Sequence, residues 1–486
     1  MSLFEPAAWT SRIFIDDWRP GSGGDYPVIE PATGEELGRL GQATPDDVRT
    51  AAARAAGAQR DWARTPYQVR AGIMRRAGDL WKEHAADVQR WLIREAGSIP
   101  PKTELETWFA ANACYEAAGL VSLPYGELLQ TMEPHLSMTR RMPVGVVGVI
   151  SPFNVPLILS IRAVAPALAL GNAVILKPDP RTAVSGGVTL ARVFQEAGLP
   201  DGVFSLLPGG ADVGEALVTD PDVRMISFTG STRAGRIVGA LAGRHLKRSH
   251  LELGGNSALI VLDDVDVDKA VSVGAWGSYL HQGQICMATS RHLVQKGIAE
   301  EYVAKLAQHA DQLPVGDPNK DQVALGPIID AKQRDHIHQL VTSSVAAGAR
   351  LASGGTYSGL FYRPTVLADV PLTAPAYTEE IFGPVAPVVA FDTIDDAVRL
   401  AADTTYGLAL GILTRDVMKG LAIADRIPSG NVHINDQTVA DEVVNPFGGV
   451  RDSGPGARVG GAQANLEAFT DVQWITMRGE LPAYPF

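Results

Sequence analysis

The chain has 486 residues, more than one hydrophobic core usually organises, so we expect two or three domains. Its 46% hydrophobic and 20% charged residues are typical of a water-soluble globular protein. A net charge of −12 leaves no basic surplus to neutralise phosphates, which excludes a general nucleic-acid binder.

Two cysteines, Cys114 and Cys286, are too few for a disulfide framework in a chain of this size. Reduced thiols are typical of the cytosol, so we expect a cytoplasmic protein. The N-terminus has no basic start followed by an apolar block, and no secretion signal is therefore expected. The apolar stretch 143–178 is interrupted by Arg162 and by prolines, whereas a membrane-spanning helix needs about 20 uninterrupted residues. We therefore expect no membrane partner.

The first long periodic segment runs from about Pro45 to Leu120, where apolar residues begin a helical spacing. Beyond it, short β-branched runs alternate with helix-length segments. Between the first two of these runs, Asn154 and Pro156 predict a helix start and Gly171 predicts its end. The alternation predicts a parallel, doubly wound sheet, which binds ligands at the carboxyl ends of its strands. The predicted strands are 145–150, 172–177, 202–207, 223–228 and 250–253.

A second alternating series begins after Gly255 and predicts another α/β domain over about 254–450. The final run, 471–477, is expected to be a strand that leaves this domain. An exposed strand edge needs a partner, so we expect it to pair with another domain or subunit. The predicted helices of this half are 267–281 and 299–313, and the predicted strands are 257–262, 292–295 and 383–391.

The segment HQGQICMATS at 281–290 places Cys286 beside small and polar residues, where a substrate can reach it. Cys114 lies instead in an apolar helical run. A nucleophilic thiol also needs surroundings that favour the thiolate, and a lone cysteine is more often an inert apolar residue. Both interpretations of Cys286 stay open on local sequence alone.

Two charged residues end apolar strands. Glu252 in LELGG (251–255) is expected to be partly buried, which would raise its pKa toward the range of a general base. The alternative is an ordinary ion pair near a loop. Lys177 is placed to donate to ribose hydroxyls at the ligand-binding edge of the sheet, and the alternative is a solvated lysine.

Asn154 has two interpretations: an N-cap of the following helix, or an amide that donates to a developing oxyanion. The glycine clusters PGGADVG (208–214) and FTGSTRAG (228–235) can each accept a pyrophosphate at a helix N-terminus. Neither has the G-x-G-x-x-G spacing of the common dinucleotide fingerprint, and ordinary loop glycines are the alternative.

Seven segments occur in one order along the chain: SPFNVP, LKP, FTGSTRAG, LELGG, GQIC, EEIFGPV and PFGGVRDSG. In this order and spacing the chain resembles the aldehyde dehydrogenase superfamily, nearly from end to end. The stretches 176–187 and 433–449 resemble the bacterial branch that oxidises aromatic aldehydes such as benzaldehyde and vanillin. The resemblance makes Cys286 the expected nucleophile.

The resemblance implies an α/β, aldehyde dehydrogenase-like fold in three parts. A Rossmann-like, doubly wound nicotinamide-cofactor-binding domain would comprise residues 1–124 and 145–253, and an α/β catalytic domain would comprise 254–450. A small β bridging and oligomerisation element, a hairpin near 125–144 plus the C-terminal strand, would comprise 125–144 and 466–486. A homodimer or homotetramer is implied.

It also implies a mechanism for a small-molecule aldehyde substrate, with no metal. The Cys286 thiolate adds to the carbonyl, Asn154 and the Cys286 backbone N–H hold the oxyanion, and Glu252 activates the water that hydrolyses the thioester. The implied cofactor-binding residues are Lys177, Gly210, Gly214, Gly230, Ser231, Glu380 and Phe382. The substrate-pocket candidates are Phe153, Arg162, Ile285, Met287 and Phe447. Arg162 would meet a ring substituent or form an ordinary ion pair.

One departure from the family bears on the cofactor. NAD-preferring members commonly carry a glutamate three residues after the lysine, and here that position is Pro180, next to Asp179. NAD is the expected cofactor, with NADP as an alternative because a missing carboxylate removes repulsion against a 2′-phosphate. Phe153 in place of tryptophan and Arg451 in place of lysine are conservative departures.

Other functions compete with aromatic aldehyde oxidation. The substrate can instead be an aliphatic aldehyde or a semialdehyde. Transfer of the acyl group to CoA is disfavoured, since family members of that kind usually lack the glutamate equivalent to Glu252. A non-catalytic relative would have lost the nucleophile or the base, and a cofactor-free esterase would not need the glycine clusters or Glu380.

Overall fold

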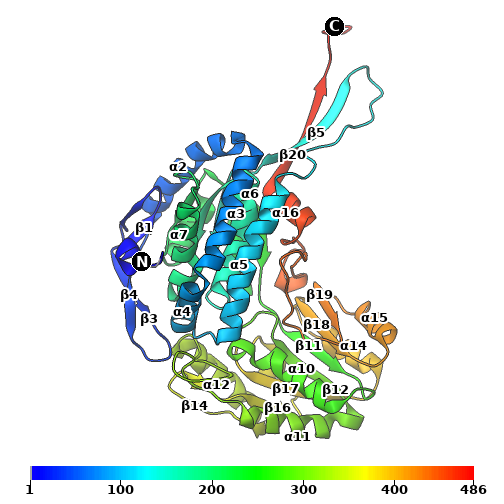
Figure 1. Ribbon diagram of the computed structural model, residues 1–486. Coiled ribbons are helices and arrows are strands. Elements are labelled where there is room, and N and C mark those ends of the chain that lie inside the picture. Colours follow the sequence, from blue (N-terminus) through cyan, green and yellow to red (C-terminus); the bar gives the residue numbers. More distant parts are fainter. Residues whose placement is uncertain (1–2) are drawn as a thin grey trace.

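The computed structural model describes residues 3–486, which form two large sheets, each covered by helices on both faces, and a narrow protruding arm (Figure 1). The first sheet has seven strands in the order β10-β9-β6-β7-β8-β1-β2. Five of them are parallel and match the five predicted strands: β6 (Val146–Ile150), β7 (Ala173–Lys177), β8 (Phe204–Leu206), β9 (Val223–Thr229) and β10 (Arg248–Glu252). An antiparallel pair, β1 (Arg12–Phe14) and β2 (Trp18–Pro20), completes the edge. The strand order reverses between β6 and β9, which confirms the doubly wound fold.

Alternate residues of the central strands bury opposite faces of this sheet. Val147, Val149 and Leu176 belong to one apolar cluster, whereas Val146 and Ile175 belong to another. Both sides of each strand are therefore apolar, as expected for a parallel sheet between helix layers. The helices of this half are α2 (Pro45–Arg64), α3 (Tyr67–Glu83), α4 (Ala85–Ala96), α5 (Pro100–Leu120), α6 (Pro156–Ala169), α7 (Thr189–Glu196), α8 (Ala211–Thr219) and α9 (Thr232–Arg244).

The helical region predicted over 45–120 is four consecutive helices. Pro66 precedes α3, and Gly97, in the left-handed conformation with φ 64°, ends α4. Pro100 is the first residue of α5, the position in a helix where proline is favoured. The breaks allow the helices to pack as neighbours, with α5 against both α3 and α6.

The second sheet also has seven strands, in the order β13-β16-β17-β12-β11-β18-β19. It confirms the second α/β unit expected after Gly255. Its strands are β11 (Ser257–Val261), β12 (Thr289–Gln295), β13 (Arg350–Ser353), β16 (Thr365–Ala368), β17 (Val385–Phe391), β18 (Ala409–Leu413) and β19 (Asn431–Ile434). Its helices are α10 (Val267–Tyr279), α11 (Lys296–Gln312), α12 (Ala331–Ala346), α13 (Pro375–Thr378), α14 (Ile394–Ala402) and α15 (Val417–Ala424).

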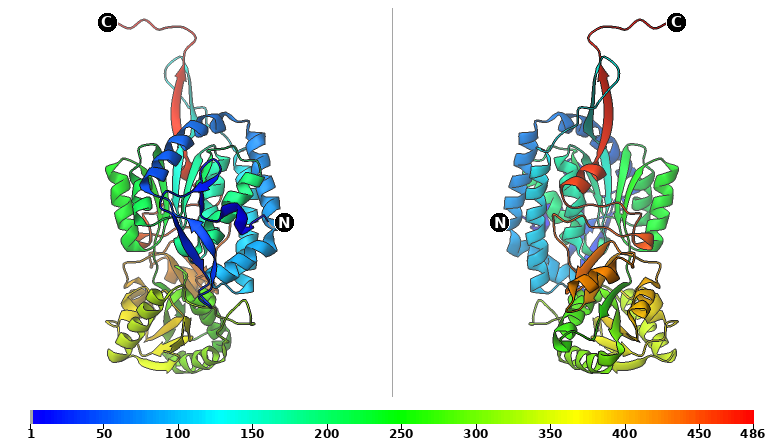
Figure 2. Two further views of the ribbon diagram at one scale, coloured as in Figure 1. Left: turned by 90° about the vertical axis from the view of Figure 1, so that its left-hand side faces the viewer. Right: turned by 90° about the vertical axis from the view of Figure 1, so that its right-hand side faces the viewer.

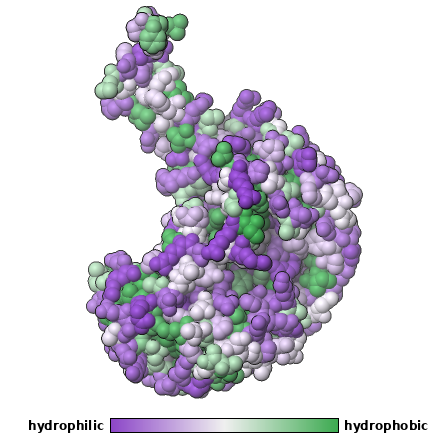
Figure 3. Space-filling model, turned by 180° about the vertical axis from the view of Figure 1, so that it is seen from behind, coloured by the Kyte–Doolittle hydropathy of each residue, from purple (hydrophilic) through white to green (hydrophobic). Residues whose placement is uncertain are grey.

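The arm pairs two strands that are far apart in the sequence. β5 (Leu136–Pro143) and β20 (Thr470–Met477) are antiparallel over their whole length, and residues 125–129 run beside β5 through backbone hydrogen bonds. The expected final strand thus has its partner within the same chain. The arm extends away from the body, and hydrophobic side chains lie at its tip (Figures 2 and 3). Smaller elements complete the fold: α1 (Pro6–Trp9), β3 (Asp25–Ile29), β4 (Glu36–Gly41), β14 (Tyr357–Ser358), β15 (Phe361–Tyr362) and α16 (Ala462–Phe469). Across residues 3–486, no helix has the length and apolar character needed to cross a membrane.

Candidate active site

A cavity of about 450 Å³ opens at the carboxyl ends of β6, β7 and β9, where the strand order reverses. Strand ends at such a reversal are the usual ligand site of a doubly wound sheet. The second unit closes the cavity with the segment that carries Cys286 and with residues around Glu380. We call this cavity the cofactor cleft. Of the residues singled out in the sequence, those that line it are Phe153, Asn154, Lys177, Asp179, Gly230, Ser231, Cys286, Glu380 and Phe382.

Cys286 follows a turn with an unusual backbone. After α10, the residues His281, Gln282 and Gly283 have φ angles of 50°, 57° and 66°, so three successive residues are left-handed. The predicted helix 267–281 therefore ends early, at Tyr279. The Gln282 side-chain amide holds the turn in place by donating to the carbonyls of Gly97 (3.2 Å) and Pro327 (2.8 Å).

The surroundings of Cys286 do not favour the thiolate. The residue is partly exposed, but burial raises the pKa of the thiol to about 12, and the charges of Glu380 and Glu252 add to that rise. Arg162 opposes it. The thiol is therefore protonated at neutral pH, and a base has to take its proton when it attacks. Cys114 is fully buried in α5, where no substrate can reach it.

Glu252 is the last residue of β10 and is only 4% exposed. Neither of its carboxylate oxygens accepts a well-aligned hydrogen bond within residues 3–486, although His250 is close to one of them. Burial raises the pKa of this carboxyl, and the neighbouring His250 imidazole, whose Nε2 lies 3.2 Å from Oε1, opposes the rise. The surroundings are thus those of a general base and not of an ordinary surface ion pair.

Asn154 does not cap the helix that follows it. The N-cap of α6 is Val155, and the backbone N–H of Leu157 donates to Oε2 of Glu106 at 3.1 Å. Glu106 in turn pairs with the buried Lys102 at 2.5 Å. The capping interpretation is therefore wrong. The Asn154 side chain is buried and lines the cleft, so its amide N–H groups are placed to donate to a ligand.

Lys177 and Asp179 place opposite charges at the end of β7. Lys177 is 7% exposed and burial lowers its pKa, so the solvated interpretation is wrong. Burial favours a raised pKa for Asp179, but two hydrogen bonds from Arg181, at 2.9 and 2.8 Å, hold it below its ordinary value. The Arg181 guanidinium also lies 4.1 Å from the centre of the Phe153 ring. A carboxylate therefore lines the cleft although residue 180 is proline.

The N-terminus of α9 faces the same cleft. Ser231 caps this helix by accepting from the Ala234 backbone N–H at 3.4 Å, and Gly230 precedes it. A helix N-terminus with a lysine nearby suits an anion such as a pyrophosphate. Gly210 and Gly214, at the start of α8, are not among the lining residues. Gly214 lies behind Lys177, since a Cβ added there would be 3.7 Å from the lysine side chain.

Glu380 and Phe382 line the part of the cleft that adjoins Cys286. Oε1 of Glu380 accepts from the backbone N–H of Gly255 at 2.9 Å, and burial raises the pKa of this carboxyl to about 7. The rings of Phe382 and Phe153 meet edge to face at 5.8 Å. The cleft thus offers a cation, a carboxylate, a helix N-terminus and aromatic edges, a combination that fits a dinucleotide.

On its other side Cys286 adjoins apolar residues. Ile285, Met287 and Phe447 pack in one cluster with Cys286 at its margin. Arg162 lies over the Phe447 ring, with 4.6 Å between the guanidinium carbon and the ring centre, and forms an ion pair with Asp441. The ion-pair interpretation of Arg162 is therefore confirmed.

Sequence reasoning missed His250 and Asp441. The signal for His250 was present, because residues two apart in a strand share a face, and Glu252 was already a candidate. Asp441 lies 279 residues from Arg162 in an irregular segment, and nothing local pointed to it. Across residues 3–486, no group of three or more His, Cys, Asp or Glu side chains is arranged to hold a metal ion.

Comparison with known proteins identifies the family. Residues 18–475 match the model of the aldehyde dehydrogenase family. A vanillin dehydrogenase from Amycolatopsis is 65% identical over 486 residues, the whole of both chains. A benzaldehyde dehydrogenase [NAD(+)] from Pseudomonas putida is 49% identical over 99% of each chain. These relatives confirm the resemblance to the branch that acts on aromatic aldehydes.

Solved structures agree with the fold. Betaine aldehyde dehydrogenase from Staphylococcus aureus in complex with NAD+ has a TM-score of 0.96 at 28% identity, covering 100% of this chain and 98% of that one. An NADP-dependent enzyme from E. coli has a TM-score of 0.93 at 32% identity, covering 97% and 98%. Within this fold Cys286 and Asn154 line the cofactor cleft, and Glu252 does not line it but is near enough for its charge to act on the Cys286 thiol. The chain belongs to the aldehyde dehydrogenase family.

Proposed function

We propose that the protein catalyses the NAD-dependent oxidation of aromatic aldehydes to carboxylic acids. One observation carries this proposal: Cys286 and Asn154 line the same cleft, which is suited to a dinucleotide, and the charge of the buried Glu252 carboxylate acts on the Cys286 thiol. The identity to vanillin and benzaldehyde dehydrogenases supports the aromatic class of substrate.

In the first step, Sγ of Cys286 adds to the aldehyde carbon, and the thiol proton passes to Glu252. This transfer is needed because the pKa of the thiol is about 12 and that of the carboxyl is raised toward neutrality. The carbonyl oxygen becomes an oxyanion, which receives hydrogen bonds from the Asn154 amide and the Cys286 backbone N–H. Bound NAD supplies the hydride acceptor.

In the second step, water hydrolyses the thioester on Cys286. Glu252 first loses the proton it took from the thiol and then takes one from the attacking water. Its burial matters in both steps, since a desolvated carboxylate is a stronger base than a solvated one. The acid leaves, and Cys286 recovers its proton.

We assign the cofactor cleft to NAD. Lys177 and Asp179 would hold the adenosine ribose, Gly230 and Ser231 the pyrophosphate, and Glu380 with Phe382 the nicotinamide end. The Asp179 carboxylate favours NAD over NADP, because it stays ionised at neutral pH and would repel a 2′-phosphate. Gly210 and Gly214, the second of which lies behind Lys177, stay as predicted contributors.

The larger organisation is part of the same proposal. Residues 1–124 and 145–253 would form the cofactor-binding domain, 254–450 the catalytic domain, and 125–144 with 466–486 the bridging element. The arm of β5 and β20 carries exposed apolar side chains, which supports a homodimer or homotetramer. Two unpaired cysteines support a cytoplasmic location.

The test is a panel of aldehydes with the purified protein. Benzaldehyde, vanillin and acetaldehyde are each supplied with NAD or NADP, and reduced cofactor and acid product are measured. We expect the aromatic aldehydes with NAD to give the highest kcat/KM. Equal values for acetaldehyde and benzaldehyde would contradict the aromatic assignment. Formation of an acyl-CoA on addition of CoA would contradict hydrolysis.

A further inference from the structure

Arg181 lines the cofactor cleft from the first α/β unit and reaches across to the second. Its Nε and Nη2 donate to the two carboxylate oxygens of Asp179, at 2.9 and 2.8 Å, and its Nη1 donates to Oδ2 of Asp330 at 2.6 Å. Asp179 follows β7 in the first unit, whereas Asp330 directly precedes α12 in the second. One guanidinium therefore joins the two units at the cleft.

An ordinary surface ion pair is the alternative for these contacts, since the Arg181 side chain is 40% exposed. Exposed pairs contribute little unless their geometry is bidentate or several charges form a network. Here the contact with Asp179 is bidentate, and the same guanidinium also holds Asp330. Its carbon lies 4.1 Å from the centre of the Phe153 ring. Arginine, with a planar fork of donors, can make these contacts together, and lysine cannot.

Hydrogen bonds lead from Asp330 to the part of the cleft that adjoins Cys286. Oδ1 of Asp330 caps α12 by accepting from the Gln333 backbone N–H at 2.8 Å. The Gln333 side-chain amide donates to the carbonyl of Phe382 at 3.0 Å. Phe382 lines the cleft and is proposed to contact the nicotinamide end of NAD. The first turn of α12 therefore links Arg181 to the backbone of Phe382.

Aromatic contacts provide a second link between Arg181 and Phe382. The Phe153 ring meets the Arg181 guanidinium and also meets the Phe382 ring, edge to face at 5.8 Å. The two links thus join into a closed set of contacts, which we call the contact set: Arg181, Asp330, Gln333, Phe382 and Phe153. Because Arg181 also holds Asp179, which is proposed to bind the adenosine ribose, the contact set reaches both ends of the cleft.

The backbone of Phe382 depends on its surroundings. Its φ angle is 52°, in the left-handed region that a bulky side chain rarely adopts. A residue in such a conformation persists only where neighbouring groups hold it. Gln333 holds its carbonyl, and Phe153 packs against its ring. The position of Phe382 is therefore sensitive to the other members of the contact set.

We propose that Arg181 is a positioning residue that couples the two ends of the cofactor cleft. Cofactor bound at the ribose end fixes Asp179 and Arg181, and the contact set then fixes Phe382 against the nicotinamide. Arg181 thus acts on hydride transfer through Phe382 and contributes little to affinity. This inference rests on the proposed function and goes beyond it, because it assigns a task to the junction between the two units.

The first experiment uses ADP, which carries the adenosine ribose and two phosphates and lacks the nicotinamide end. Hydrogen–deuterium exchange is measured by mass spectrometry on the full chain, with and without saturating ADP. We expect ADP to slow amide exchange in the peptide that contains Phe382, because the contact set becomes fixed. ADP ends short of the nicotinamide end, so protection there reports coupling between the two ends.

Two variants interrupt the contact set. In Asp330→Asn the side-chain oxygen still caps α12, but the amide N–H₂ cannot accept from Arg181. Arg181→Lys removes both the bidentate fork and the contact with the Phe153 ring. Both variants should bind ADP within about threefold of the original Kd, as expected for an exposed pair. Protection at Phe382 should be reduced in Asp330→Asn and lost in Arg181→Lys.

The second experiment measures the burst of reduced cofactor at saturating NAD, where affinity no longer limits the rate. We expect the burst to slow by about tenfold in Asp330→Asn and by up to about a hundredfold in Arg181→Lys, the range of a small misplacement of reacting groups. Benzaldehyde with deuterium on the aldehyde carbon should slow the burst of both variants further. Such an isotope effect identifies hydride transfer as the affected step.

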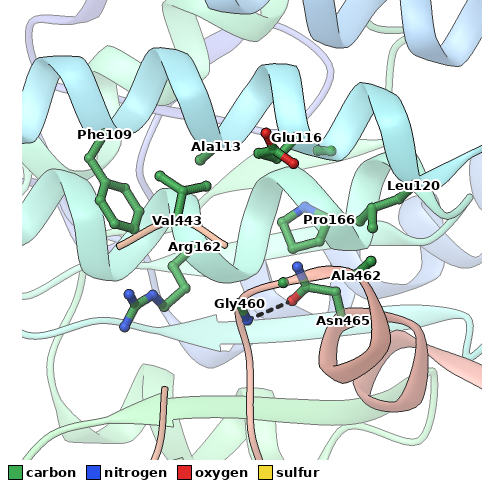
Figure 4. Close-up of a pocket in the computed structure, with 12 residues that line it drawn as sticks. Phe109, Ala113, Glu116, Leu120, Arg162, Pro166, Val443, Gly460, Ala462 and Asn465 are labelled. Carbon is green, nitrogen blue, oxygen red and sulfur yellow. Dashed lines mark hydrogen bonds between the residues drawn. The ribbon is translucent and has the colours of Figure 1, made fainter. Parts of the chain in front are cut away.

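Asn465→Ala is the control for a general loss of stability. Asn465 does not line the cofactor cleft but a separate cavity of about 30 Å³ between α5, α6 and α16 (Figure 4). Its side-chain oxygen accepts from the Gly460 backbone N–H at 3.0 Å (Figure 4). Losing this bond should lower the melting temperature. The protection at Phe382 and the burst rate should stay unchanged.

Three results would overturn the proposal. One is that ADP binds the unmodified protein without slowing exchange at Phe382. Another is that the two variants lose affinity for ADP but keep their burst rate, because Arg181 would then be a binding residue alone. The third is an equal slowing of the burst in Asn465→Ala. Failure of the proposed function gives a different result: no burst with any aldehyde, although ADP still protects Phe382.

Discussion

Cys286 adjoins two regions that differ in chemistry. On one side, the cofactor cleft measures about 450 Å³ and is lined by Lys177, Asp179 and the start of α9, whereas on the other side Cys286 packs against the apolar side chains of Ile285, Met287 and Phe447. The cleft suits a large, polar, anionic molecule, and the opposite side suits a flat, apolar one. A thiol between them can meet both molecules at once, without either blocking the other. The predictions that follow test this difference between the two sides.

The largest effect is expected from removing the thiol shared by both sides. Cys286→Ala should abolish oxidation of every aldehyde, because no other thiol reaches the site. NAD binding should persist, since the groups that line the cleft are unchanged. Reduced-cofactor absorbance and calorimetric titration with NAD measure the two properties. Cys114→Ala is the matched control and should keep the turnover of the unmodified protein. Residual turnover in Cys286→Ala would contradict the mechanism.

The next effect separates the two tasks of Glu252. Glu252→Gln should lower steady-state turnover by about a thousandfold, which is the usual loss when a positioned general base is removed. Its first-turnover burst should be slow at pH 7 and should accelerate as pH rises. The burst accelerates because the pKa of the Cys286 thiol is about 12, so the fraction of thiolate increases with pH throughout the range below that value. Stopped-flow measurement at several pH values reports the burst, and a pH-independent burst would mean that Glu252 takes no part in thiol attack.

Asn154→Ala should lower kcat/KM by about a hundredfold to a thousandfold, the usual loss for one oxyanion donor. The fold should survive, because Glu106 and not Asn154 meets the first free N–H of α6. Asn154→Asp, which keeps the shape but cannot donate, is the matched comparison. Steady-state kinetics measure the loss of activity, and thermal unfolding measures the stability of each variant. If Asn154→Ala and Asn154→Asp both lower the melting temperature by the same amount, Asn154 has a structural role.

The smallest effect concerns His250. Burial raises the pKa of Glu252 and His250 opposes this, so His250→Leu should raise that pKa further. A base works only when deprotonated, and the acid limb of the kcat profile should therefore move to higher pH. At neutral pH the rate should fall a few-fold and recover in alkaline buffer. An acid limb that stays in place would assign His250 to packing alone.

The sequence predicted the central strands well because their apolar runs are short and are bounded by glycine and proline. The predicted 145–150 and 172–177 agree with β6 and β7 to within one residue. The helical region 45–120 was harder, since its break at His84 carries no local signal, unlike those at Pro66 and Gly97. The rule that ligands bind at strand ends correctly placed Lys177 and Asn154 in one cleft with Cys286.

What the sequence did not predict depends on contacts between distant segments. The capping role of Glu106 toward α6 frees Asn154, and only the packing of α5 on α6 reveals it. The raised pKa of Cys286 comes first from burial, to which the charges of Glu380 and Glu252, far apart in the chain, add. The pairing of Arg162 with Asp441 likewise requires the segment after β19 to return to α6.

The arm has a consequence for how the chain is made. Arg140 on β5 and Gln473 on β20 are hydrogen-bonded but lie 333 residues apart. At a synthesis rate of roughly 5–20 residues per second, β5 emerges from the ribosome roughly 15 to 70 s before its partner. Throughout that time the edge of β5 that pairs with β20 is open, and the apolar side chains of Leu136 and Met142 lie exposed on the same strand. A nascent chain that stalls before Thr470 is therefore prone to aggregate through β5. We expect this strand to be the one that needs protection by chaperones during synthesis.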